Sequence, residues 1–131
     1  MLPKDYLQKM SSLTRAHDGL VIADEIQTGL GRMGAPYFWG YQMSDIEPDI
    51  VIAGKGLGNG FPISAVVCKE SVFAKYNECK KFIFSTYGAN CVAAAVASEV
   101  LDVLREEDVP KRVASLGKVV SKHLHAGKCE H

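Results

Sequence analysis

Apolar residues recur along the chain in two patterns, which predict helices and buried strands in alternation. Leu7, Met10 and Leu13 recur at helical spacing between polar neighbours, which is typical of an amphipathic helix. Short continuous apolar runs, such as residues 50–53, are typical of strands that are buried on both faces. The expected helices span residues 4–17, 70–76, 91–105 and 111–126, and the expected strands span residues 20–23, 50–53, 63–68 and 82–84.

The alternation of buried strands with helices predicts an α/β fold, in which a mostly parallel sheet is flanked by helices. No repeat, low-complexity tract or Pro/Ser-rich linker divides the sequence, so residues 1–131 are expected to form one structural unit. Strands of this buried kind need cover on both faces and neighbours on both edges, which three or four strands do not provide. We therefore expect the chain to be part of a larger domain.

The composition predicts a globular chain without a strongly charged partner. Apolar residues make up 47% of the sequence, and 15 Lys and Arg residues balance 15 Asp and Glu residues. This balance predicts neither nucleic acid nor a membrane as a partner. The longest uncharged stretch, residues 82–98, is shorter than the roughly 20 apolar residues of a spanning helix. The first residues show neither an apolar signal core nor an Arg-rich transit pattern, so no targeting segment is expected here.

Two strand ends carry side chains whose chemistry suits a cofactor. Asp24 follows the expected strand at 20–23, and Lys55 follows the strand at 50–53 inside a glycine-rich loop, residues 54–60. In an open α/β sheet, ligands bind outside the carboxyl ends of the strands. An amine and a carboxylate at that edge suit pyridoxal phosphate, which needs a lysine to hold its aldehyde as a Schiff base and a carboxylate to keep its ring nitrogen protonated.

Each of these residues also has an ordinary structural interpretation. The glycine-rich loop matches neither the P-loop nor the dinucleotide fingerprint, because Asp49 and Gly56 stand where a P-loop needs Gly and a hydroxyl residue. A carboxylate after a strand often caps a turn, and a lysine in a loop is often only a solvated charge. The two residues alone therefore leave the function of this edge open.

Histidine and cysteine residues near the end of the chain give no pattern typical of a metal site. His123 and His125 lie two positions apart on an expected helix and therefore face different sides, which argues against a shared metal ion. Adding Cys129 and His131 gives only a cluster in the last residues of the chain. We expect no metal site.

Three longer segments resemble a known family. They read LVIADEIQTGLGRMG at residues 20–34, PDIVIAGKGLGNGFPISAVV at 48–67 and STYGANCVAAAVASEVL at 85–101. In sequence, order and spacing these segments resemble the three consecutive signatures of class III pyridoxal-phosphate aminotransferases. The resemblance implies a partial cofactor-binding (large) domain of the type I fold of pyridoxal-phosphate-dependent transferases, with residues 109–131 leading towards a C-terminal small domain.

The resemblance also implies roles for single residues. Lys55 matches the Schiff-base lysine, and Asp24 matches the partner of the pyridinium nitrogen. Gln27 matches the residue near the cofactor ring and its phenolic oxygen. Thr86 matches the hydroxyl that binds the cofactor phosphate of the other subunit in a homodimer. Cys91 departs from the family, which has Pro there, and this departure is expected to loosen the turn that presents Thr86.

The resemblance implies that the protein is a transaminase, which moves an amino group between an amino acid such as alanine and a 2-oxo acid such as glyoxylate or pyruvate. It also implies a mitochondrial location. Family members are much longer than this sequence, so we expect the 131 residues alone to be inactive. Two alternatives stay open. The chain is either a catalytically incomplete remnant with a role in folding or interaction, or part of a phospho-lyase of the same class.

Overall fold

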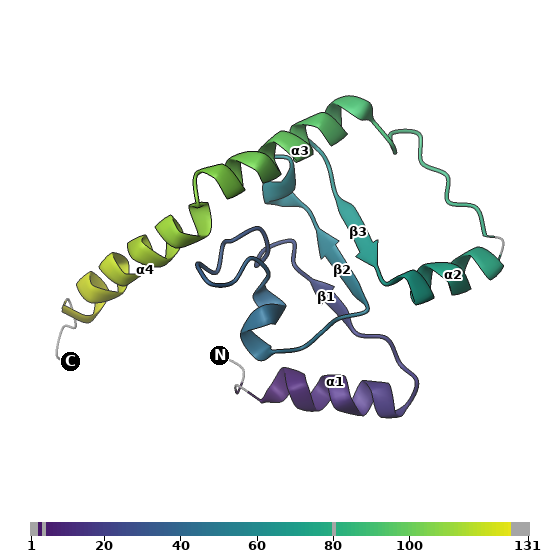
Figure 1. Ribbon diagram of the computed structural model, residues 1–131, viewed down its shortest axis with the longest axis horizontal. Coiled ribbons are helices and arrows are strands. Elements are labelled where there is room, and N and C mark those ends of the chain that lie inside the picture. The colour runs from purple at the N-terminus through teal and green to yellow at the C-terminus, as the bar shows by residue number, and fades with distance from the viewer. Residues whose placement is uncertain (1–2, 4, 80, 127–131) are drawn as a thin grey trace.

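The computed structural model describes residues 3, 5–79 and 81–126. α1 lies near one end of a small sheet, while α3 crosses the other end and leads into α4 (Figure 1). The elements follow in the order α1 (Tyr6–Ala16), β1 (Ile22–Asp24), the 3-10 helix η1 (Gly40–Ser44), β2 (Ile50–Ala53), the 3-10 helix η2 (Lys55–Leu57), β3 (Ala65–Cys68), α2 (Glu70–Glu78), α3 (Cys91–Glu106) and α4 (Val109–Ala126).

The helical spacing in the sequence predicts the four α-helices to within two residues at every boundary. Asn90 caps α3, because its Oδ1 accepts the backbone N–H groups of Val92 and Ala93 at 2.9 and 3.0 Å. Cys91 therefore starts a well-capped helix. Pro110 lies in the first turn of α4, where a helix needs no N–H donor, instead of between the two helices.

The sheet is mixed, so the expectation of a mostly parallel sheet is wrong for one of its two strand pairs. β1 and β2 are parallel, with Asp24 opposite Ile52, whereas β3 runs antiparallel to β2, with Ala65 opposite Ala53. A parallel crossover needs about a dozen residues or more, most often with a helix. The connection over residues 54–64 contains only the short helix η2, so the chain turns back beside β2 instead.

Residues 82–84 form no strand, which corrects the fourth expected strand. This segment is irregular, and the side chains of Phe82, Ile83 and Phe84 are 87%, 75% and 79% exposed. A strand requires a neighbour that takes up its backbone N–H and C=O groups. The sheet found within the described residues contains β1, β2 and β3, and none of them pairs with this segment.

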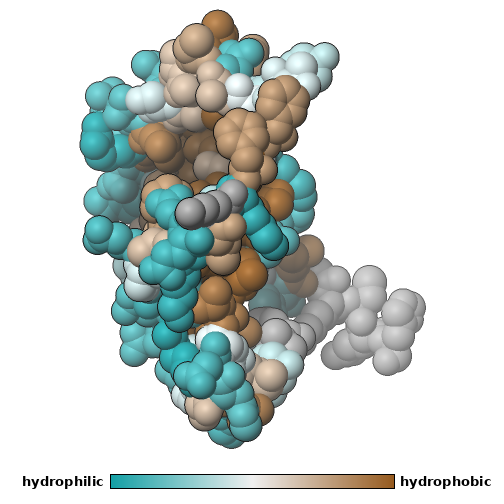
Figure 2. Space-filling model, turned by 90° about the vertical axis from the view of Figure 1, so that its right-hand side faces the viewer, coloured by the Kyte–Doolittle hydropathy of each residue, from teal (hydrophilic) through white to brown (hydrophobic). Residues whose placement is uncertain are grey.

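The described core lies between the carboxyl end of β2 and helix α3. Its buried residues are Leu30, Ala53, Leu57 and Ala97. The sheet itself is open on both faces at β3, because Val66 and Val67 point to opposite sides and both are exposed. Figure 2 shows apolar side chains gathered on the side of the molecule that carries α2 and the connection from α2 to α3.

The assignment of residues 109–131 to a helix that leads into a small domain stays a prediction. α4 covers residues 109–126, and residues 127–131 lie outside the described residues. Within the described ranges, no helix is both long enough and apolar enough to cross a membrane.

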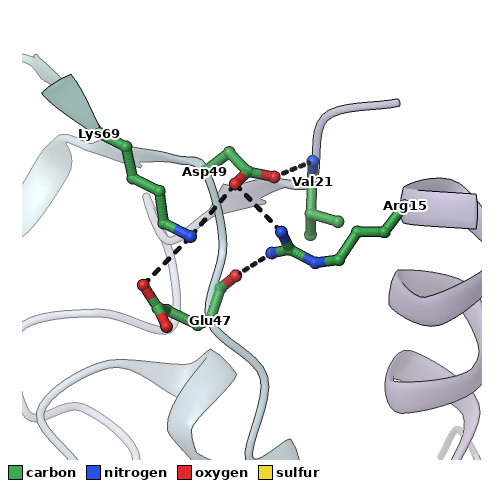
Figure 3. Close-up of polar contacts among 5 residues, drawn as sticks. All are labelled: Arg15, Val21, Glu47, Asp49 and Lys69. Carbon is green, nitrogen blue, oxygen red and sulfur yellow. Dashed lines mark hydrogen bonds and ion pairs between the residues drawn. The ribbon is translucent and has the colours of Figure 1, made fainter. Parts of the chain in front are cut away.

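A cluster of ion pairs joins α1 to the amino end of β2 and to the end of β3 (Figure 3). Asp49 is buried, accepts the Val21 N–H at 2.9 Å, and contacts the cations of Arg15 at 3.3 Å and Lys69 at 3.2 Å. Glu47 adds a second carboxylate 3.1 Å from Lys69 Nζ. The hydrogen bond from Val21, followed by the contacts with the two cations, holds the pKa of Asp49 below its usual value.

Candidate functional site

Asp24 and Lys55 lie at the carboxyl ends of two neighbouring parallel strands. Asp24 is the last residue of β1, and Lys55 follows β2 after one glycine, Gly54. Asp24 stands opposite Ile52 in the register, and adjacent strands lie about 4.8 Å apart. Both residues therefore reach the same edge of the sheet, which is the edge where open α/β sheets bind ligands.

The Lys55 side chain contacts Gln27. Lys55 Nζ donates to Gln27 Oε1 at 2.7 Å, which joins two expected site residues across 28 positions of sequence. The backbone of Lys55 has a φ of 45°, a left-handed conformation that is costly for a residue with a side chain. Here the chain leaves β2 and enters η2, where the Leu57 N–H donates to the Gly54 carbonyl at 3.0 Å. An unfavourable backbone conformation at the residue that carries the amine is a feature often found at functional sites.

The carboxylate of Asp24 takes part in a turn and is accessible from solvent. Asp24 Oδ1 accepts the Ile26 N–H at 3.2 Å, which is the turn-capping role that a strand-end carboxylate often has. The contact involves Oδ1, and the residue as a whole is exposed. Asp24 can therefore cap its turn and still offer an oxygen to a ligand at this edge.

Glu25 is a buried carboxylate at the site that the sequence did not single out. Only 4% of the residue is exposed, and its carboxylate accepts the Thr28 hydroxyl at 2.7 Å, the Gly40 N–H at 2.8 Å and the Tyr41 N–H at 2.7 Å. Burial and the nearby Glu25 carboxylate raise the pKa of Tyr41. Two of the three donors are backbone groups, which every residue except proline has, so the sequence carries no signal for them.

Thr86 belongs to a different segment from the other three expected site residues. It belongs to the exposed connection between α2 and α3. It lies in a turn in which the Gly88 N–H donates to the Ser85 carbonyl at 3.3 Å. None of the hydrogen bonds found among the described residues joins Thr86 to Lys55, Gln27 or Asp24. The structure thus brings together Lys55 and Gln27, with Asp24 at the same edge, and leaves Thr86 outside this group.

Residues 5–79 and 81–126 contain no group of three or more His, Cys, Asp and Glu side chains that could hold a metal ion. His123 Nδ1 and His125 Nδ1 lie 2.8 and 2.7 Å from backbone carbonyl oxygens one turn earlier in α4. Cys129 and His131 lie outside the described residues.

Comparison with known families agrees with the resemblance of the three sequence segments. The whole chain, residues 1–131, matches the family model described as aminotransferase class-III. The chain belongs to the class III aminotransferases. Pyridoxal phosphate is the cofactor of this family.

Two curated relatives and one solved structure are similar to this class III chain. The human protein "Alanine--glyoxylate aminotransferase 2, mitochondrial" is 43% identical over 115 residues, which cover 88% of this chain and 22% of the human one. "Ethanolamine-phosphate phospho-lyase homolog 1" of Caenorhabditis elegans is 41% identical over 131 residues, 98% of this chain and 28% of its own length. An S-selective transaminase from Arthrobacter sp., solved with alanine bound, superposes with a TM-score of 0.89 at 31% identity, over 96% of this chain and 27% of its own.

The likeness to the human enzyme is also visible in short segments. Residues 37–42 (YFWGYQ) and Phe61 predict a resemblance to mitochondrial alanine–glyoxylate aminotransferase 2, and the 43% identity confirms it. The chain spans about a quarter of the length of the relatives that it matches.

The residues at the sheet edge fit the cofactor of the family. A lysine amine, a carboxylate and a side-chain amide are the groups that an aldehyde, a pyridine nitrogen and a phenolic oxygen require. Lys55 and Gln27 are already in contact, and Asp24 ends the neighbouring strand. This donor set, on one edge of the sheet, is compatible with pyridoxal phosphate.

Proposed function

We propose that this chain is the cofactor-binding part of a transaminase that moves an amino group between alanine, or a similar amino acid, and a 2-oxo acid such as glyoxylate or pyruvate. The observation that carries the proposal is the 2.7 Å contact between the Lys55 amine and Gln27, at the edge where Asp24 ends β1. The identity of 43% to human alanine–glyoxylate aminotransferase 2 supports this choice of substrates.

Three residues would hold the cofactor, each through a different atom. Lys55 would bind its aldehyde carbon, Asp24 would face its ring nitrogen, and Gln27 would contact its phenolic oxygen. When bound, the cofactor supplies an electron sink for the negative charge that develops at the substrate α-carbon. Asp24 sustains that sink, because a neighbouring carboxylate favours the protonated ring nitrogen.

Lys55 has a second task, which is proton transfer. When its amine is free, Lys55 would take the proton from the substrate α-carbon as a general base and deliver it to the cofactor. Gln27 Oε1, which accepts from Lys55 Nζ at 2.7 Å, keeps this amine at the edge of the sheet. A lysine on a flexible four-carbon stem is suited to both roles.

We also propose that the protein is a mitochondrial homodimer in which Thr86 binds the cofactor phosphate of the other subunit. A hydroxyl is a suitable donor to a phosphate oxygen. Thr86 lies on an exposed segment, beside Phe82, Phe84 and Tyr87, which are 87%, 79% and 89% exposed. Large exposed apolar side chains in one segment are typical of an interaction surface.

A phospho-lyase is the second candidate function, and one observation favours it. The nematode phospho-lyase homolog matches 98% of this chain at 41% identity, a similarity close to that of the human aminotransferase. Both functions would use Lys55 and Asp24, and they differ in the substrate. A chain that holds the cofactor but turns over neither substrate is the third candidate, since the expected inactivity of these 131 residues alone is part of the proposal.

A cofactor titration followed by two product assays separates these candidates. Pyridoxal phosphate is added to the purified protein and to Lys55→Ala and Asp24→Asn variants, and binding is followed by the change in cofactor absorbance. We expect saturable binding that Lys55→Ala abolishes and Asp24→Asn weakens. Equal binding by the wild type and Lys55→Ala would contradict the proposal.

The loaded protein is then given alanine with glyoxylate, or phosphoethanolamine. Pyruvate from alanine supports the transaminase, and phosphate release without pyruvate supports the phospho-lyase. Cofactor binding with neither product identifies a chain that needs further parts of the protein for turnover.

A further inference from the structure

The carboxylate of Glu25 joins the turn that carries Gln27 to the start of η1, which is far from it in the sequence. Its hydrogen bonds to Gly40 and Tyr41 span 15 and 16 positions, and its bond to Thr28 stays within its own turn. Hydrogen bonds to an ionised carboxylate are stronger than neutral ones. A buried carboxylate depends on them, because a buried charge without partners is very costly. The segment after β1 is therefore fastened to the start of η1.

The backbone of Glu25 fixes the turn that contains Gln27. The Glu25 N–H donates to the Ile52 carbonyl at 2.9 Å, next to the last strand pair of β1 and β2. The Glu25 carbonyl accepts the Gly29 N–H at 2.9 Å and so closes a turn over residues 25–29. Gln27 lies in the middle of this turn, and its amide oxygen accepts from the Lys55 amine.

Two glycines allow the segments around this turn to pack closely. A Cβ atom on Gly40 would lie 2.7 Å from Thr28 Cβ and 3.1 Å from Glu25 Oε2. A Cβ atom on Gly29 would lie 2.7 Å from the ring of Trp39. A Cβ atom at these distances would force the neighbouring atoms to shift, so the observed close packing of these segments requires glycine.

We propose that Glu25 is a positioning residue, whose buried carboxylate holds the turn over residues 25–29 so that Gln27 faces the Lys55 amine. The inference rests on the proposed function, which makes the Lys55–Gln27 pair part of the cofactor site. Glu25 is not a ligand of the cofactor in this account, because its carboxylate is buried and occupied by Thr28, Gly40 and Tyr41. It acts through Gln27.

Asp49 offers a matched control for the effect of burying a carboxylate. It is 6% exposed, against 4% for Glu25, and it also accepts a backbone N–H from another segment. Its partners Arg15 and Lys69 lie at the amino end of β2, with the strand between them and Lys55. Asp49→Asn should therefore destabilise the fold without changing the Lys55–Gln27 pair.

The test measures the reactivity of the Lys55 amine without the cofactor. Trinitrobenzenesulfonate modifies unprotonated, accessible amines, so an amine that a hydrogen-bond acceptor holds in place should react more slowly, and peptide mapping gives the rate at Lys55 alone. Glu25→Gln keeps the shape of the side chain but replaces one carboxylate oxygen with an NH₂ group. This group would face a backbone N–H donor that now has no acceptor, so the turn should shift. We expect modification of Lys55 to accelerate about fivefold, the net value of one lost hydrogen bond.

A double-mutant cycle separates positioning from simple destabilisation. If Glu25 acts through Gln27, Gln27→Ala alone accelerates the modification by a similar factor, and adding Glu25→Gln to Gln27→Ala changes little further. Asp49→Asn should leave the rate at Lys55 within about twofold of the wild type. An equal acceleration by Glu25→Gln in the presence and absence of Gln27, or one matched by Asp49→Asn, would overturn the proposal.

Thr28→Val keeps the test decisive if Glu25→Gln does not fold. This variant removes only the hydroxyl donor at 2.7 Å and preserves the branched shape, so we expect about a twofold acceleration at Lys55 that disappears in the Gln27→Ala background. A Thr28→Val rate equal to that of the wild type would contradict the proposal. Since the reagent is not the cofactor, these rates stay informative even if pyridoxal phosphate fails to bind, which would overturn the proposed function alone.

Discussion

Two lysines follow strands of the same sheet, and their surroundings differ in one respect. Lys69 comes directly after β3, and its amine lies 3.1 Å from Glu47 and 3.2 Å from Asp49. Lys55 follows β2 after one glycine, and its amine contacts the neutral amide of Gln27 at 2.7 Å. Hydrogen bonds to Glu47, then to Asp49, raise the pKa of Lys69.

Under the proposed function, this difference separates a structural lysine from a reactive one. An ammonium group between two carboxylates stays protonated and holds neighbouring segments together, which Lys69 does for the end of β3 and the segment before β2 (Figure 3). An amine that contacts a neutral amide does not have to break an ion pair before it attacks an aldehyde. The position after a strand is therefore insufficient to make a lysine reactive, and the partner of its amine matters more.

The largest expected effect comes from removing the Lys55 amine. Lys55→Arg keeps a positive charge and a long stem but cannot bind an aldehyde, so reductive capture of pyridoxal phosphate with borohydride should fall at least about tenfold. The matched variant Lys69→Arg should keep the captured amount of the wild type, because the amine that it removes is held by two carboxylates. Mass spectrometry of the reduced proteins measures both. Loss of capture in Lys69→Arg and not in Lys55→Arg would reverse the comparison.

The next effect concerns the stability that the Asp49 cluster provides. Asp49→Asn leaves Arg15 and Lys69 without their buried partner and should lower the free energy of unfolding by about 2 kcal/mol. Urea unfolding at neutral pH measures this difference.

The same cluster predicts a pH dependence. Folding lowers the pKa of Asp49, so its contribution is fully present above the ordinary value of 3.8 and is lost as the pH falls through the lower pKa of the folded state. The gap between the wild type and Asp49→Asn should therefore close in acid. A gap that stays constant from neutral pH to below the folded-state pKa would contradict this role.

The smallest expected effect comes from Glu47, whose side chain is 82% exposed. Exposed ion pairs contribute little, so Glu47→Gln should change the free energy of unfolding by less than about 0.5 kcal/mol. The same variant removes the main contact that raises the pKa of Lys69, so trinitrobenzenesulfonate should modify Lys69 faster, with no change at Lys55. Acceleration at both lysines would mean that their surroundings are coupled.

The sequence predicted the elements whose pattern is local. The i, i+3 and i, i+4 spacing gave the four helices, and the apolar run at β2 gave its bounds without error, because both signals depend on neighbouring residues. The antiparallel direction of β3 was missed, because it follows from the short connection over residues 54–64. The prediction of a strand at residues 82–84 is wrong, because three apolar residues do not show whether another strand pairs with them.

The site residues also divide into those that the sequence could suggest and those that it could not. Lys55 and Asp24 could be proposed from their places after buried strands, and their roles, with that of Gln27, came from the family resemblance. Glu25 could not, because two of its three donors are the backbone N–H groups of Gly40 and Tyr41, in a loop whose path the sequence does not specify. The role of Thr86 in a second subunit stays a prediction.

The most direct test of the comparison measures both lysines in one molecule. The purified protein is incubated with limiting pyridoxal phosphate and reduced with borohydride, and the label on the peptides of Lys55 and Lys69 is quantified in the same digest. We predict that Lys55 carries at least about ten times as much label as Lys69, since a tenfold ratio corresponds to little more than one hydrogen bond. Equal label on the two lysines would contradict the claim that Lys55, whose amine contacts a neutral amide, reacts with the cofactor more readily than Lys69, which two carboxylates hold.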